Sequence, residues 1–191
     1  MERRDALAEK RRASAPDPGA NLTNPVRARP GLLPLLVLLA VLELATLASS
    51  LALPPVVASH FDGSGAPDGA MPRWLYMALM GLLVAGAPLL LALLPHWLIG
   101  RDGRRLNIPH RQYWLAPQRR EETLAFLRRH GRWFAAAVAL LLAYVHALVV
   151  LANRAQPPSL STPALLAGLA VFLLATGAWL RALHVRFRLP G

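Results

Sequence analysis

Four long apolar runs alternate with polar segments along this chain of 191 residues. A helix rises about 1.5 Å per residue and the hydrocarbon core of a bilayer is about 30 Å thick, so about 20 apolar residues are enough to cross it. Each run reaches that length, and Pro88 predicts a kink in the second. The pattern therefore predicts an all-α membrane protein with four transmembrane helices, at about residues 31–53, 74–100, 133–152 and 163–182.

The polar segments predict different structures. Residues 1–30 hold many Lys and Arg residues but few apolar side chains, so they predict a basic, largely disordered tail before the transmembrane domain of residues 31–191. Residues 54–72 are dense in Gly, Pro and Asp and predict a short turn-rich loop, with brief extended pieces on either side of the turn. Residues 117–130 predict an amphipathic surface helix that bends at Gly131 into the third span, because proline opens the segment and acidic residues precede basic ones.

Positive charge is unevenly distributed between these segments. All but two of the 21 Lys and Arg residues lie before the first run, between the second and third, or around the end of the last. Basic residues favour the cytoplasmic side of short loops, so both termini are predicted to be cytoplasmic, with residues 54–72 outside and 117–130 inside. This topology explains the net charge of +11 without nucleic acid as a partner. The basic segments instead predict contact with anionic lipid at the inner face of the bilayer.

Few residues suit catalysis or cofactor binding. The chain has no cysteine, which excludes disulfides, thiolate nucleophiles and iron–sulfur ligation. His60, Asp62 and Asp68 carry donor atoms for a metal, but they lack EF-hand or zinc-motif spacing, and turn formation explains them. No catalytic set of residues falls at membrane depth. The sequence therefore predicts no metal, no cofactor and no enzymatic activity.

Two ionisable residues fall in the middle of apolar runs, Glu43 in the first and His146 in the third. If the two helices begin at the same depth, these residues differ in depth by about one helical rise of 1.5 Å. Thr46 and Ser50 extend a polar stripe from Glu43, and alanines recur every fourth residue beside His146, a spacing typical of close helix contact. We expect a Glu43–His146 pair, which is either a proton-linked or ligand-binding site or a hydrogen-bonded pair that orders the bundle.

Two segments outside the apolar runs carry a family resemblance. The segment LPPVVASHFDGSGAPDG, residues 53–69, resembles the signature of the domain-of-unknown-function 1648 family of bacterial membrane proteins. The run NIPHRQYWLAPQRR, residues 107–120, resembles a YWLAP-type segment of bacterial members. The resemblance implies a multi-pass protein of the bacterial inner membrane, and some relatives are Sdp immunity-like proteins that pair toxin resistance with signalling. The matching signature positions are His60, Phe61, Gly65, Pro67, Asp68 and Gly69.

Two functional hypotheses follow. In the first, a non-enzymatic recognition, signalling or immunity-type membrane protein uses the outer loop of residues 54–72 to bind a protein or peptide partner. The alternative is a small proton-coupled transporter or channel centred on Glu43 and His146, working as a homo-oligomer because four helices leave a narrow interior. The candidate loop residues for the first hypothesis are His60, Phe61, Asp62, Gly65, Pro67, Asp68 and Gly69.

Overall fold

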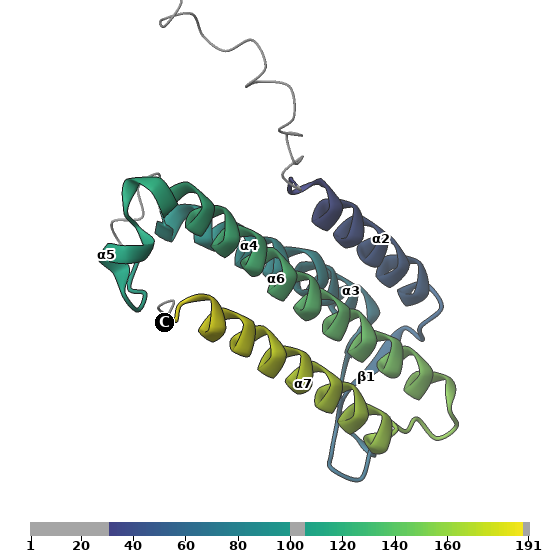
Figure 1. Ribbon diagram of the computed structural model, residues 1–191. Coiled ribbons are helices and arrows are strands. Elements are labelled where there is room, and N and C mark those ends of the chain that lie inside the picture. Colours follow the sequence, from purple (N-terminus) through teal and green to yellow (C-terminus); the bar gives the residue numbers. More distant parts are fainter. Residues whose placement is uncertain (1–30, 100–105, 189–191) are drawn as a thin grey trace, which may run out of the picture.

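The computed structural model describes residues 31–99 and 106–188, and most of them are helical (Figure 1). The basic tail predicted for residues 1–30 lies outside the described residues. Four helical segments are long and apolar enough to cross a membrane, and they fall where the apolar runs predict them. The chain is therefore a multi-pass membrane protein. The four segments are Leu33–Ser50, Arg73–Pro95, Pro117–Arg154 and Thr162–Arg186.

The first and second spans differ in regularity. The first is a single helix, α2 (Leu33–Ser50). The second consists of α3 (Arg73–Gly81), a π-helical turn η1 (Leu82–Gly86) and α4 (Ala87–Ile99). A proline within a helix clashes with the carbonyl four residues before it. For Pro88 that residue is Val84, inside η1, so the wider turn lies where the proline disturbs the regular hydrogen bonding.

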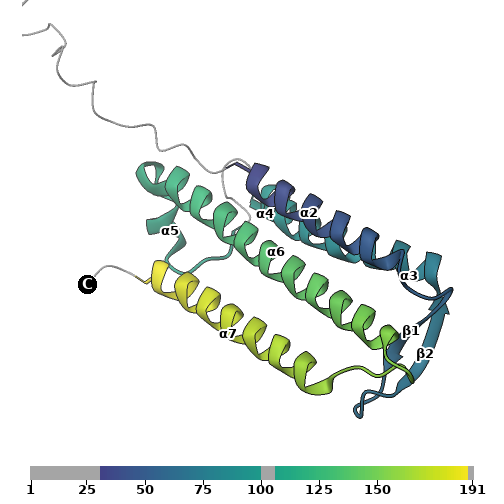
Figure 2. The same cartoon turned by 90° about the vertical axis from the view of Figure 1, so that its right-hand side faces the viewer.

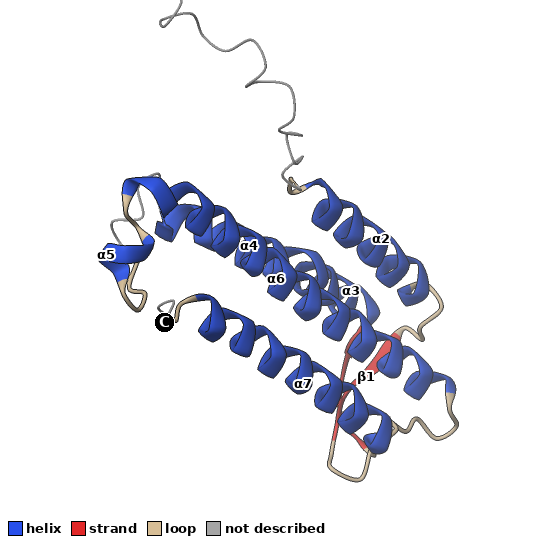
Figure 3. Cartoon of the chain, viewed as in Figure 1, coloured by secondary structure: helices blue, strands red, loops and turns tan. Residues whose placement is uncertain are grey.

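A two-stranded antiparallel sheet closes one end of the bundle. Strands β1 (Val56–Phe61) and β2 (Pro67–Pro72) form a hairpin between the first and second spans (Figures 2 and 3). The predicted extended pieces are thus present, and they pair as a small hairpin within a structure that is otherwise mostly helical, as predicted. We call this the hairpin end of the bundle. The short helix α5 (Arg111–Trp114) marks the opposite end, which we call the α5 end.

The third span is longer than its apolar run. Helix α6 (Pro117–Arg154) has 38 residues, so residues 117–130 are helical as predicted, but they continue into the third span without the predicted interruption at Gly131. Thr123 and Leu124, in its second turn, are buried against the rest of the protein. A Cβ atom at Gly131 would lie 3.0 Å from Pro95 Cγ. The glycine therefore permits close contact between α6 and α4, and this packing offsets its low helix propensity.

Helix α6 is the centre of the packing, with α2 and α4 against it, whereas α7 (Thr162–Arg186) runs along its other side (Figures 1 and 2). Near the α5 end, Ala135 and Ala139 of α6 are fully buried against Leu35 and Leu39 of α2. Their lack of bulk allows the helices to approach closely, as the alanine repeat predicts. Helix α7 has no buried residue. The core near the hairpin end includes Val57, Tyr76, Met80, Val84, Leu148 and Leu160.

Candidate functional site

The base of the hairpin is joined to the end of the first span by Arg73. Its guanidinium Nη1 donates to the carbonyl oxygens of Leu51 at 3.1 Å and Leu53 at 2.8 Å, just after α2 ends. Its backbone N–H donates to Pro55 O at 2.9 Å. Carbonyls at a helix C-terminus lack partners within the helix and favour a positive charge. Arg73 supplies both, and it thereby links the base of the hairpin to the end of α2.

One edge of the hairpin is closed by Asn153, near the end of α6. Its Oδ1 accepts from the backbone N–H of Ala58 at 2.9 Å, and its Nδ2 donates to Ala58 O at 2.9 Å and to Val149 O at 2.9 Å. The amide thus makes the two bonds that a neighbouring strand would make. Because Ala58 directs both groups away from β2, its pairing with Ala70 is of the non-hydrogen-bonded kind. The N–H and C=O of Ala70 therefore point out along the other edge, β2.

Asp62 organises the turn at the tip of the hairpin. Its Oδ1 accepts from the Ser64 hydroxyl at 2.6 Å, the Ser64 N–H at 2.8 Å and the Ala66 N–H at 3.0 Å. The Ser64 hydroxyl, followed by the Ala66 N–H, lowers the pKa of the Asp62 carboxyl below its usual value, because these bonds favour the charged form. Asp62 therefore stabilises the turn rather than presenting a free carboxylate.

The tip is docked on the loop between α6 and α7. The Leu160 N–H donates to Gly65 O at 2.9 Å, and Thr162 Oγ1 donates to Gly63 O at 3.3 Å. Gly65 has a φ of 88°, and a Cβ atom there would collide with the Leu160 carbonyl oxygen. Only glycine fits both the backbone conformation and the close contact. The hairpin is thus held at its base, along one edge and at its tip.

The structure divides the predicted loop residues into two groups. Gly65 is buried, Phe61 packs partly buried against the core, and Asp62 is committed to the turn. Gly69 lies against the His60 ring, which a Cβ atom would approach to 3.3 Å. The second group is exposed and available for contact, and it comprises His60, Pro67 and Asp68.

A polar network lies beneath the hairpin, between three spans. His146 of α6 is 3% exposed, and its Nε2 lies 2.8 Å from Ser49 Oγ of α2. Its Nδ1 lies 3.0 Å from Tyr76 Oη of α3, and the two rings stack with centroids 5.8 Å apart. Because Ser49 Oγ donates to Ala45 O at 2.7 Å, it accepts from His146 Nε2–H, and Nδ1 accepts from the tyrosine hydroxyl. Both ring nitrogens of His146 therefore have a hydrogen-bond partner on another span.

The predicted contact between Glu43 and His146 is absent from the structure. Both ring nitrogens of His146 are occupied by other partners, and Ser49 lies six residues beyond Glu43, about 9 Å along the axis. The prediction assumed that α2 and α6 start level, whereas the packing of alanines against leucines sets a different stagger. Tyr76 was missed because a tyrosine at the edge of an apolar run resembles an interfacial anchor.

Glu43 occupies a separate position at the contact between α2 and α3. A Cβ atom at Gly81 would lie 2.6 Å from Glu43 Oε1, so the carboxyl group fills the space that the glycine leaves, next to η1. Its Oε2 is buried and has no hydrogen-bond partner within the described residues. Thr46 and Ser50 are buried on the same side of α2, as the polar stripe predicts.

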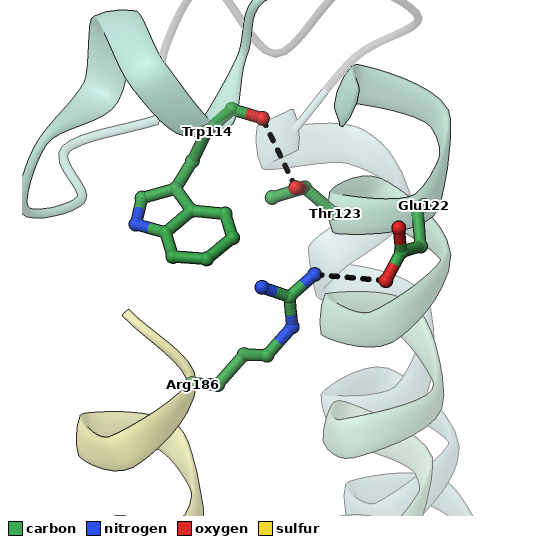
Figure 4. Close-up of polar contacts among 4 residues, drawn as sticks. All are labelled: Trp114, Glu122, Thr123 and Arg186. Atoms are coloured by element: carbon green, nitrogen blue, oxygen red, sulfur yellow. Dashed lines mark hydrogen bonds and ion pairs between the residues drawn. The ribbon is translucent and has the colours of Figure 1, made fainter. Parts of the chain in front are cut away.

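The α5 end is held by aromatic rings and an ion pair (Figure 4). Thr123 Oγ1 donates to Trp114 O at 3.0 Å, and Arg186 Nη2 donates to Glu122 Oε1 at 3.0 Å. The Arg186 guanidinium lies 4.3 Å from the centroid of the Trp114 ring, and Trp114 Nε1 donates to Phe187 O at 3.3 Å. These contacts attach the segment around Trp114 to the end of the fourth span.

No group of three or more His, Cys, Asp or Glu side chains in residues 31–99 and 106–188 is arranged to hold a metal ion. Comparison of the chain with protein-family models, with curated proteins and with solved structures finds no match in any of the three. The family resemblance of residues 53–69 and 107–120 therefore stays a prediction from the sequence.

Proposed function

We propose that this chain is a non-enzymatic recognition protein of the bacterial inner membrane, of a signalling or immunity type. Both termini are cytoplasmic, and the hairpin faces outward to bind a protein or peptide. The arginine distribution supports the orientation, because all but two of the 21 Lys and Arg residues fall in alternate segments.

The observation that carries the proposal is the way the hairpin is held. Asn153, Arg73 and the backbone of Leu160 fasten it at three places, while His60 and Asp68 stay exposed. A binding surface that is ordered before binding loses little conformational entropy when a partner arrives. A loop whose only role was to connect two spans would not need this number of long-range contacts.

The free edge of β2 supports an extended peptide as the partner. Ala70 is exposed, and its N–H and C=O point away from β1. Such an edge accepts an added strand through main-chain bonds, while flanking side chains supply specificity. His60 and Asp68, on either strand beside the turn, would provide that specificity. Pro67 and Pro72 limit the accessible edge to a few residues, which favours a short ligand segment.

The test is a selection of displayed peptides against the full chain in lipid nanodiscs, followed by affinity measurements. We expect enriched peptides that lose about tenfold or more in affinity for Ala70→Pro, which removes the edge N–H, and for the double variant His60→Ala/Asp68→Ala. Glu43→Gln and the exposed-turn control Gly63→Ala should bind normally. Failure to enrich any peptide, or loss of binding in Glu43→Gln alone, contradicts the proposal.

The second candidate is proton-coupled transport centred on Glu43 and His146, and one observation favours it. A buried carboxyl oxygen without a partner costs several kcal/mol within a membrane unless it binds a proton or water. Both ring nitrogens of His146 are already hydrogen-bonded to Ser49 and Tyr76, so Glu43 would be the main proton-carrying group. Proton flux into proteoliposomes, read by an internal pH-sensitive dye, tests it. Transport predicts flux that Glu43→Gln abolishes and His60→Ala preserves.

A further inference from the structure

A cleft opens between α2 and α6 at the α5 end, on the side of the molecule away from the hairpin. Its volume is 530 Å³. One wall is the first two turns of α2 with Pro34, Leu35 and Leu38, and the other is α6 around Ala136. These side chains make the floor of the cleft, between the two walls, apolar, so the floor suits a hydrocarbon chain rather than a polar solute.

The rim of the cleft is positively charged. Arg129 and Arg132 both line it, three residues apart on one face of α6. A guanidinium pair at this spacing matches the geometry of a phosphate group, which accepts several hydrogen bonds at once.

The depth of the cleft is that of a lipid headgroup. Arg132 is the last basic residue of α6 before its apolar stretch begins. Trp133 follows it and is 69% exposed, as expected of an aromatic anchor at the membrane interface. Pro34 lies in the first turn of α2, where that span also begins. The charged rim therefore meets the interface, and the apolar floor extends toward the bilayer core.

We propose that this cleft is a binding site for a single anionic phospholipid from the surrounding bilayer. Its phosphate is held by Arg129 and Arg132, and one acyl chain lies against Leu35, Leu38 and Ala136. The site lies at the opposite end of the bundle from the hairpin, and the proposal does not rest on peptide binding. It differs from diffuse attraction to a charged membrane because one lipid occupies one cleft.

Native mass spectrometry of the full chain in detergent tests the proposal. The probes are phosphatidylglycerol and phosphatidylcholine with identical acyl chains. We expect one phosphatidylglycerol to bind about tenfold more tightly than phosphatidylcholine, because each arginine near the phosphate contributes favourably. The double variant Arg129→Gln/Arg132→Gln should lose this preference. The matched control Arg128→Gln/Arg181→Gln removes the same charge outside the cleft and should keep it.

Two further variants separate charge from shape. Arg129→Lys/Arg132→Lys retains the positive charge and should still prefer phosphatidylglycerol over phosphatidylcholine, though less strongly. This variant tests the charge even if the glutamine variant fails to fold. Ala136→Phe fills the floor of the cleft and should weaken both lipids without altering the rim. Equal binding of the two lipids, equal losses in the glutamine variant and its control, or unchanged binding in Ala136→Phe each overturns the proposal. A soluble glycerophosphoglycerol that binds as tightly as the lipid overturns it as well.

Discussion

The two ends of the bundle are held together by different chemistry. At the hairpin end, most long-range contacts are hydrogen bonds between uncharged groups, as in the bonds of Asn153 to Ala58 and of Leu160 to Gly65. At the α5 end, stacked rings and arginines dominate, as in the contact of Arg186 with Trp114. The difference follows the distribution of charge along the chain, since among the described residues the hairpin end has only Arg73 and Arg154, whereas most other arginines lie toward the α5 end. It implies that the stability of the hairpin end depends on how well uncharged groups fit together, whereas the stability of the α5 end depends on ionic conditions.

The largest expected effect comes from Gly65 at the tip of the hairpin. Gly65→Val forces a branched side chain into a positive φ and against the Leu160 carbonyl. We expect a loss of about 2–5 kcal/mol in unfolding free energy, measured by thermal unfolding in detergent micelles. Gly63→Ala is the matched control, because a Cβ atom there meets nothing within 4 Å. A similar loss in both variants would show that the tip is not docked.

Replacing Asn153 should open the closed edge of the hairpin. Asn153→Leu keeps the volume but leaves the N–H and C=O of Ala58 without partners. We expect a loss of about 1–3 kcal/mol and faster amide exchange at Ala58, measured by hydrogen–deuterium exchange. Arg154→Ala, at the exposed neighbouring position, should leave the exchange rate unchanged. Slow exchange that survives in Asn153→Leu would contradict the closed edge.

A smaller effect is expected where α7 meets α6. His130 Nε2 donates to Trp179 O and Trp179 Nε1 donates to His130 O, each at 3.0 Å, with the rings stacked 4.6 Å apart. Trp179→Phe removes one donor and should cost about 1 kcal/mol, measured by the same thermal unfolding. Trp97→Phe, at a residue that is 65% exposed, should cost less. Equal losses in the two variants would mean that the His130–Trp179 contact does not stabilise the packing of α7 on α6.

The smallest effect is expected for the ion pair at the α5 end. Glu122→Gln removes the partner of Arg186, but the Glu122 side chain is 78% exposed. Exposed ion pairs contribute below about 1 kcal/mol and are screened by salt. The variant should therefore differ slightly from the parent chain at low ionic strength and not at 1 M salt. A loss that persists at high salt would show that the pair is not screened.

Most of the architecture could be predicted because it depends on local pattern. Apolar length indicated the four spans, and the turn residues indicated a hairpin-like loop near Gly65. The stagger between α2 and α6 could not be predicted, because it depends on how Ala135 and Ala139 fit against leucines far away in sequence. For the same reason the partners of His146 were not foreseen.

In the candidate site too, features that follow from local sequence could be predicted, and those that depend on long-range contacts could not. The exposure of His60 and Asp68 follows from their place in a polar turn. The bonds from Asn153 to Ala58 join residues 95 positions apart, and a single asparagine at a helix end carries no signal of its target. Gly65 was singled out by the predicted family resemblance, but the physical reason for a glycine there, the contact with the Leu160 carbonyl, could be found only from the fold.

The unbroken length of α6 has a mechanical consequence. At 1.5 Å per residue its 38 residues extend about 57 Å, nearly twice the thickness of a bilayer core. Near one end of α6, Asn153 is hydrogen-bonded to the hairpin strand at Ala58. Near the other end, Thr123 is hydrogen-bonded to the Trp114 carbonyl. A continuous helix cannot take up a displacement by bending at one point along its length. A force on the hairpin would therefore shift or rotate α6 as one body and move the contacts at the α5 end with it.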